Sequence, residues 1–170
     1  MANGVRIRHK RMINFISFMM ESQMVIRDLT LLVVNPWVDI YVEEIKRRVP
    51  ELKIISSNLL HEQDKEINAD IKDVNIILSF APLVKSQPKM KHLMWFQSLA
   101  AGVNHIIDSG VLSRDVILTN AAGVASIGLS EYAITIILAF MKKFPMLIRN
   151  QLERRWGFWS SNELHRKTIG

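Results

Sequence analysis

The sequence has 170 residues, 49% of them hydrophobic, which suits one globular domain with part of a second. The absence of cysteine excludes disulfides, cysteine metal sites and a thiol nucleophile, and it permits the reducing, cytoplasmic location that we expect. Basic residues gather near the two ends and account for the net charge of +6, so we expect no folded basic face and no nucleic-acid partner.

The first residues pair a basic stretch, "RIRHKR", with an apolar one, "MINFISFMM". This order is typical of a signal peptide, but Asn14 and Ser17 interrupt the apolar run and no small-residue cleavage site follows. The run is also far shorter than the roughly 20 residues that span a bilayer. We therefore predict that residues 1–27 are a disordered extension and that the chain has no membrane partner.

Five short apolar runs then alternate with helical or polar stretches, at residues 29–35, 52–57, 74–80, 93–99 and 115–120. Between the first two runs, one helical face would carry five apolar residues, namely Val38, Tyr41, Val42, Ile45 and Val49. Buried strands separated by helices predict an α/β fold, with a parallel sheet covered on both faces.

A long helical stretch follows the fifth run, beginning near Ser126, and it is apolar almost all round from Tyr132 to Met141. That pattern predicts burial on more than one side, as for a helix between two bodies. Pro145 should end or kink this helix near Phe144. The polar segment 150–167 comes next, and the final "TIG" reads as the first step of a new strand.

The stretch "WFQSLAAGVNH", residues 95–105, ends a strand in small residues. Ligands of parallel sheets bind beyond the carboxyl ends of the strands, where this stretch and residues 119–124 both lie. Small residues there either permit a tight turn or let a ligand approach the backbone amides. The residues alone favour neither reading.

Three segments in this order resemble the D-isomer-specific 2-hydroxyacid dehydrogenase family. They are "SLAAGVNHI" (98–106), "LTNAAGVASIGLSEYAI" (118–134) and "QLERRWGFWSSNELHRKTIG" (151–170). The resemblance implies a flavodoxin-like substrate domain over residues 28–125 and an interdomain helix and linker over 126–167. It also implies that residues 168–170 begin a Rossmann-type cofactor domain, which we expect to continue beyond Gly170 with a G-x-G-x-x-G motif.

The resemblance implies an NAD(P)-dependent oxidoreductase that transfers a hydride between nicotinamide and a 2-hydroxy or 2-oxo acid, and a homodimer when intact. The family's substrate-binding positions correspond to Ala100, Ala101, Gly102 and Val103. Its positions near the cofactor, NAD or NADP, correspond to Ala101, Asn120 and Leu129. Leu129 replaces the commoner Thr, Ser or Val, and Asn104 replaces the commoner Asp.

The family's catalytic Arg, Glu and His have no counterpart in these 170 residues, so we assign no catalytic residue and expect the chain alone to be inactive. His105 adjoins the site loop but fits a helix start, and Glu131 fits a helix N-terminal acid. The other histidines lack metal-ligand spacing, so no metal is expected. The alternative is a non-catalytic binding or regulatory protein on the same fold, corepressor-like or a single-domain scaffold.

Overall fold

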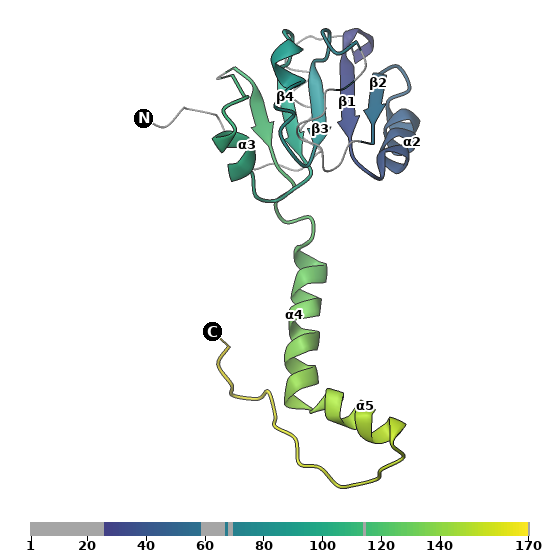
Figure 1. Ribbon diagram of the computed structural model, residues 1–170, viewed down its shortest axis with the longest axis vertical. Coiled ribbons are helices and arrows are strands. Elements are labelled where there is room, and N and C mark those ends of the chain that lie inside the picture. The colour runs from purple at the N-terminus through teal and green to yellow at the C-terminus, as the bar shows by residue number, and fades with distance from the viewer. Residues whose placement is uncertain (1–25, 59–66, 68–69, 114, 170) are drawn as a thin grey trace. The chain divides into compact units, whose positions relative to one another are not determined.

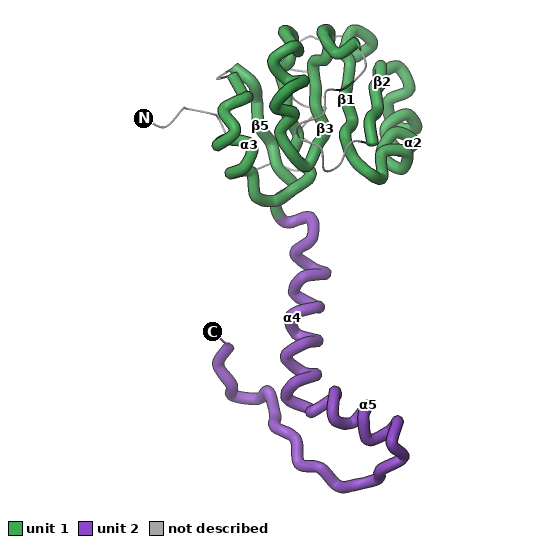
Figure 2. The backbone as a smooth tube through the Cα atoms, viewed as in Figure 1, with its two compact units in different colours: residues 1–122 green, residues 123–170 purple. Residues whose placement is uncertain are grey.

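The computed structural model of the protein describes residues 26–58, 67, 70–113 and 115–169. The chain divides into two compact units, residues 1–122 and residues 123–170 (Figure 2). The predicted extension, residues 1–27, lies outside the described residues except for its last two.

The first unit contains a parallel sheet of five strands in the order β2-β1-β3-β4-β5 (Figure 1). The strands are β1 (Thr30–Val34), β2 (Lys53–Ser57), β3 (Ile76–Ser79), β4 (Trp95–Ser98) and β5 (Ile117–Thr119). Each falls within one of the five predicted runs, and the order is that of flavodoxin. The predicted α/β, flavodoxin-like fold is therefore confirmed.

Two apolar layers cover the sheet, one on each face. On one face packs helix α2 (Val38–Arg48). Four of the five predicted apolar residues lie in this helix and the fifth, Val49, follows it directly, and all five join the cluster that contains Leu31, Val33 and Ile76. On the other face Val103 and Ile106, at the start of helix α3 (Asn104–Asp108), pack in the cluster of Leu32, Ile77 and Phe96. Two 3-10 turns, η1 (Ile26–Asp28) and η2 (Gln87–Lys89), also lie among the described residues of this unit. Residues i, i+3, i+4 and i+7 of α2 face the sheet because the helix turns every 3.6 residues.

The second unit consists of helix α4 (Ser126–Met141), helix α5 (Phe144–Leu152) and an extended C-terminal segment. The long helix ends three residues before the predicted point, because Lys143 adopts a left-handed conformation (φ 56°). Pro145 lies in the first turn of α5, where its missing N–H has no helical partner to lose. It therefore starts the second helix rather than ending the first.

No residue of α4 is buried in the chain as described, so the predicted burial of this helix is not realised there. Trp156 and Phe158 are also fully exposed, while the Trp159 indole lies so close to Gly157 that a Cβ there would approach it to 2.9 Å. The strand predicted to begin at residue 168 is not formed at Thr168 or Ile169. A strand without a neighbour gains no ladder hydrogen bonds.

Candidate functional site

Four neighbouring strands of the sheet end in the same way, each with a short polar side chain that is buried. These residues are Asn35 after β1, Ser79 in β3, Ser98 in β4 and Asn120 after β5, with exposed fractions of 0, 2, 0 and 7%. Each side-chain oxygen accepts a hydrogen bond from the backbone N–H two residues on. The donors are Trp37 at 2.7 Å, Ala81 at 3.2 Å, Ala100 at 3.1 Å and Ala122 at 3.4 Å. The chain therefore turns sharply as it leaves each strand.

The loop after β4, residues 99–103, is held by its neighbours on both sides. On the β3 side, the Leu99 N–H donates to the carbonyl oxygen of Ser79 at 3.0 Å. On the β5 side, the Ala121 N–H donates to the carbonyl of Ala100 at 3.1 Å, and Asn120 Nδ2 donates to the carbonyl of Ala101 at 2.7 Å. The carbonyls of Ala100 and Ala101 are thus occupied.

Not all of the loop's donors are occupied. The N–H groups of Ala101 and Gly102 form no hydrogen bond with any described residue, and both residues are exposed. Val103, the next residue, is buried in the core and fixes the end of the loop. A pair of fixed backbone N–H groups without acceptors suits an anion such as a carboxylate.

Gly102 distinguishes between the two interpretations of the small residues, which are a tight turn and the approach of a ligand to the backbone amides. Its φ lies outside the left-handed region, and a Cβ built on it would have no heavy atom within 4 Å. Neither backbone conformation nor packing in this structure therefore demands a glycine. A ligand that must approach the N–H groups closely would exclude a larger side chain there.

The structure brings five of the predicted site residues together. Ala100, Ala101, Gly102 and Val103 form the loop, and Asn120 binds it. The sixth, Leu129, belongs to the second unit, in α4, with 65% of its side chain exposed. Their roles toward a substrate or cofactor stay predictions.

Sequence reasoning missed two contacts at this site. The Ser98 hydroxyl caps the turn, which a serine two residues before the small-residue stretch could have indicated. The second contact joins His105 Nε2 to the carbonyl oxygen of Phe80 at 2.8 Å. No sequence signal predicts it, because the two residues are 25 positions apart and meet only through the pairing of β3 with β4.

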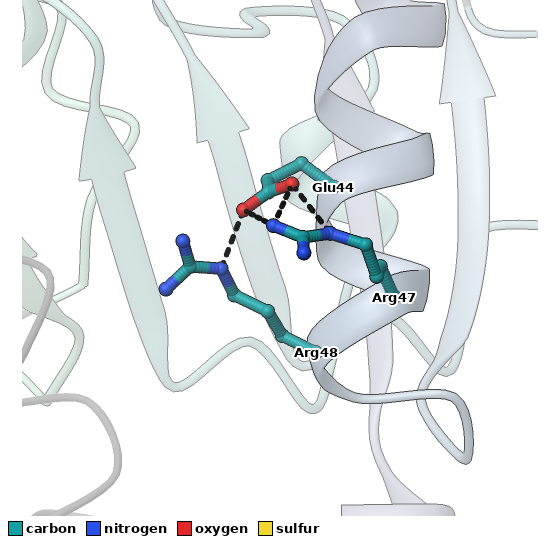
Figure 3. Close-up of polar contacts among 3 residues, drawn as sticks. All are labelled: Glu44, Arg47 and Arg48. Carbon is teal, nitrogen blue, oxygen red and sulfur yellow. Dashed lines mark hydrogen bonds and ion pairs between the residues drawn. The ribbon is translucent and has the colours of Figure 1, made fainter.

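A charged cluster lies near the end of α2 that leads to β2 (Figure 3). The Glu44 carboxylate binds Arg47 at 2.8 Å and Arg48 at 2.6 Å. Hydrogen bonds from Arg47 and then Arg48 lower the pKa of Glu44 below its ordinary value. The two arginine side chains are largely exposed and that of Glu44 is half-buried, so these ion pairs lie at the helix surface and contribute little to stability.

Among the residues that the structure describes, no three His, Cys, Asp or Glu side chains are grouped so that they could hold a metal ion. None of the helices in the same residues is long and apolar enough to cross a membrane.

No protein-family model matches the sequence, and no curated protein matches it significantly. Solved structures do match. A D-isomer-specific 2-hydroxyacid dehydrogenase family protein from Aeromonas salmonicida is 27% identical, with a TM-score of 0.64, over 79% of this chain and 43% of that protein.

Two further structures share the fold. A D-lactate dehydrogenase from Aquifex aeolicus, complexed with NAD and lactic acid, has a TM-score of 0.61 at 13% identity over 79% of this chain and 42% of its own. An NADPH-dependent glyoxylate/hydroxypyruvate reductase from Sinorhizobium meliloti, complexed with NADP and malonate, has a TM-score of 0.59 at 21% identity. The match covers 81% of this chain and 44% of that protein. The chain thus spans less than half the length of the proteins that it matches. These likenesses confirm the recognition made from the sequence: over most of its length, the chain resembles the D-isomer-specific 2-hydroxyacid dehydrogenase family.

Proposed function

We propose that this chain forms the substrate-binding part of an NAD(P)-dependent oxidoreductase that interconverts a 2-hydroxy acid and a 2-oxo acid. The ligands named for two of the similar structures, lactic acid and malonate, are carboxylic acids, and those structures hold NAD or NADP. The protein from Aeromonas salmonicida, which is 27% identical to this chain, is described as a 2-hydroxyacid dehydrogenase family protein and so supports the same class of reaction.

The observation that carries the proposal is the loop after β4. Its Ala100 and Ala101 carbonyls are bound, its Ala101 and Gly102 N–H groups form no hydrogen bond with a described residue, and Gly102 has open space where a side chain would lie. We assign the substrate carboxylate to these two N–H groups, because fixed backbone donors bind an anion without reorganising. Ala100 and Val103 hold the pair in place from either side.

The described residues fit a nicotinamide beside the loop. Ala101 is exposed and carries only a methyl group, so a flat ring has room to lie against it. When bound, the cofactor supplies or accepts the hydride. Asn120 keeps Ala101 in place through its 2.7 Å hydrogen bond, and we assign Leu129 an apolar contact with the cofactor. The sequence has no G-x-G-x-x-G motif, so the pyrophosphate must be held by residues outside this chain.

We assign no proton transfer to these residues. Nε2 of His105 is engaged with the Phe80 carbonyl, and Glu131 lies in the second unit, on α4. The catalytic acid, base and substrate-binding cation belong, in this proposal, to a cofactor domain and to the chain beyond it. The 170-residue chain alone is then inactive.

The second unit fits the role of a connection to that domain. The helix α4 exposes apolar side chains on every side. Among them are Ile127, Tyr132 and Phe140, whose exposed fractions are 74, 67 and 74%. Exposed apolar area of this extent marks a surface that another body covers. We assign the covering body to the cofactor domain, in an intact protein that is a homodimer.

The test is turnover by the intact protein. Loss of NADH or NADPH absorbance is followed with a series of 2-oxo acids of increasing side-chain length. Reduction of at least one 2-oxo acid, saturable and inhibited by a non-reacting dicarboxylate, is expected. Binding of NADH without turnover of any 2-oxo acid would overturn the proposed enzymatic function and would support the alternative, a regulatory protein.

A further inference from the structure

We propose that His105 is a positioning residue that sets the distance between the loop after β3 and the substrate loop after β4. The inference rests on the proposed function and adds a residue to it. Its basis is the 2.8 Å contact between His105 Nε2 and the carbonyl oxygen of Phe80.

The chemistry of the partner fixes the direction of this bond. A backbone carbonyl has no proton to give, so Nε2 carries the hydrogen and donates it. The Nε2 atom is therefore unable to accept a proton from a substrate while the contact lasts. Through Nε2, His105 thus acts on the site by way of Phe80.

The contact joins two segments that also share the apolar cluster of Leu83, Val103 and Ile106. The last bond between β3 and β4 is the one from the Leu99 N–H to the Ser79 carbonyl. Beyond it, in the part of the chain that the structure describes, His105 makes the only hydrogen bond between residues 80–86 and residues 100–108. Phe80 is the first residue after β3, so the bond holds that loop at its root.

One side of the contact is rigid. The side chains of Val103 and Ile106, next to His105 in sequence, are 6 and 0% exposed and anchor the start of α3 in the core. His105 itself is exposed. The Phe80 carbonyl is therefore held to the same fixed turn that carries the free N–H groups of Ala101 and Gly102. In the proposed function, the segment that His105 holds is therefore tied to the turn whose N–H groups bind the carboxylate.

This role predicts an effect on binding rather than on the chemical step. Loss of the bond lets residues 80 and 81 drift from the substrate loop, which weakens ground-state and transition-state binding alike. We expect KM for a 2-oxo acid to rise about fivefold, the factor that the net strength of one hydrogen bond supports, with kcat unchanged.

The test compares three variants of the intact protein. In His105→Gln the side-chain amide nitrogen reaches about as far as Nε2, in His105→Asn it falls short, and in His105→Leu there is no donor. The expected KM is near wild type for Gln and raised for Asn and Leu. Equal KM values in all four proteins overturn the inference, and so does a Gln variant as impaired as Leu. If the Leu variant does not fold, the Asn variant gives the same comparison.

A second readout does not need activity. The amide N–H of Ala81 belongs to the peptide group whose oxygen His105 binds, so its NMR resonance reports the contact directly. We expect the Asn variant to shift the resonances of Ala81 and Gly102 and the Gln variant to restore both. A shift at Ala81 without one at Gly102 overturns the inference. A wild-type protein that reduces no 2-oxo acid refutes the proposed function and leaves this readout to decide the role of His105.

Discussion

Asn120 holds two loops with one side chain: Nδ2 donates to the carbonyl oxygen of Ala101 at 2.7 Å, and Oδ1 accepts from the N–H of Ala122 at 3.4 Å. The side chain is 7% exposed. The end of β5 is thereby fastened to the loop after β4, and the free N–H groups of that loop keep their position.

Asn120→Ala should therefore weaken both stability and substrate binding. Loss of this part-buried hydrogen bond costs about 0.5–1.5 kcal/mol, and the released loop raises KM for a 2-oxo acid several-fold. Chemical denaturation and steady-state kinetics of the intact protein measure the two effects. Asn35→Ala is the matched control, since Asn35 caps the end of β1 and does not bind the substrate loop. It should lower stability alone, and an unchanged KM in the Asn120 variant would contradict the assignment.

Gly102→Val should raise KM at least about tenfold, equivalent to about 1.4 kcal/mol of binding, while the free energy of unfolding changes by less than about 0.5 kcal/mol. The Cβ enters open space in the protein, so only a bound carboxylate meets the new side chain. Kinetics and thermal unfolding separate the two quantities.

The control for that variant is Gly110→Ala. Gly110 has a φ of +67° and also open space around it, so a side chain there strains the backbone without touching a neighbour. About 1–2 kcal/mol of stability should be lost with KM unchanged. Loss of folding in the Gly102 variant would instead support the reading in which the small residues serve only the turn.

Glu44→Gln tests the charged cluster on α2. Because the folded pKa of Glu44 is lowered, its contribution to stability is present above the ordinary value of 4.5 and is lost as the pH falls through the folded pKa. The wild type should have a slightly higher urea midpoint than the variant at neutral pH, and the difference should vanish in strong acid and shrink in high salt. Glu43→Gln, on the same helix without such a partner, should show no difference. A difference that survives strong acid would mean that the carboxylate is not the source.

The exposed helix α4 predicts how the 170-residue chain behaves alone. It should bind an apolar fluorescent dye or self-associate, as measured by fluorescence and by light scattering. The double variant Ile127→Lys/Phe140→Lys should reduce both signals, because these side chains are each 74% exposed. Ile40→Lys changes an exposed residue of α2 and should leave the signals in place. A monomer that binds no dye would count against a missing covering domain.

The sequence was sufficient to predict the strands of the sheet, but it was not sufficient to predict the contacts between them. The apolar runs located all five strands because strands buried on both faces need unbroken apolar residues. Strand order rested on the family resemblance, since periodicity says nothing about which strands pair. The bond from Trp95 Nε1 to Thr119 Oγ1 at 2.7 Å shows the difficulty, because it exists only where β4 and β5 lie side by side.

At the candidate site, too, the sequence predicted the local features but not the contacts between them. The small residues at 100–102 and the asparagine at 120 were visible as local patterns, but their connection was not, because it spans 19 positions. The sequence predicted that Pro145 ends or kinks the long helix, but Pro145 starts α5 and α4 ends earlier, at Met141, since the left-handed Lys143 has no sequence signature. Local chemistry was readable, and contacts that depend on tertiary pairing were not.

The buried polar residues that end β1, β3, β4 and β5 have a consequence for how this protein can change. Each strand finishes its own turn with a side chain from its own segment, so the sheet needs nothing from the loop tips beyond. Those tips are free to lengthen, shorten or exchange residues while the scaffold stays folded. Libraries with randomised loop tips and fixed strand ends should therefore retain folded members.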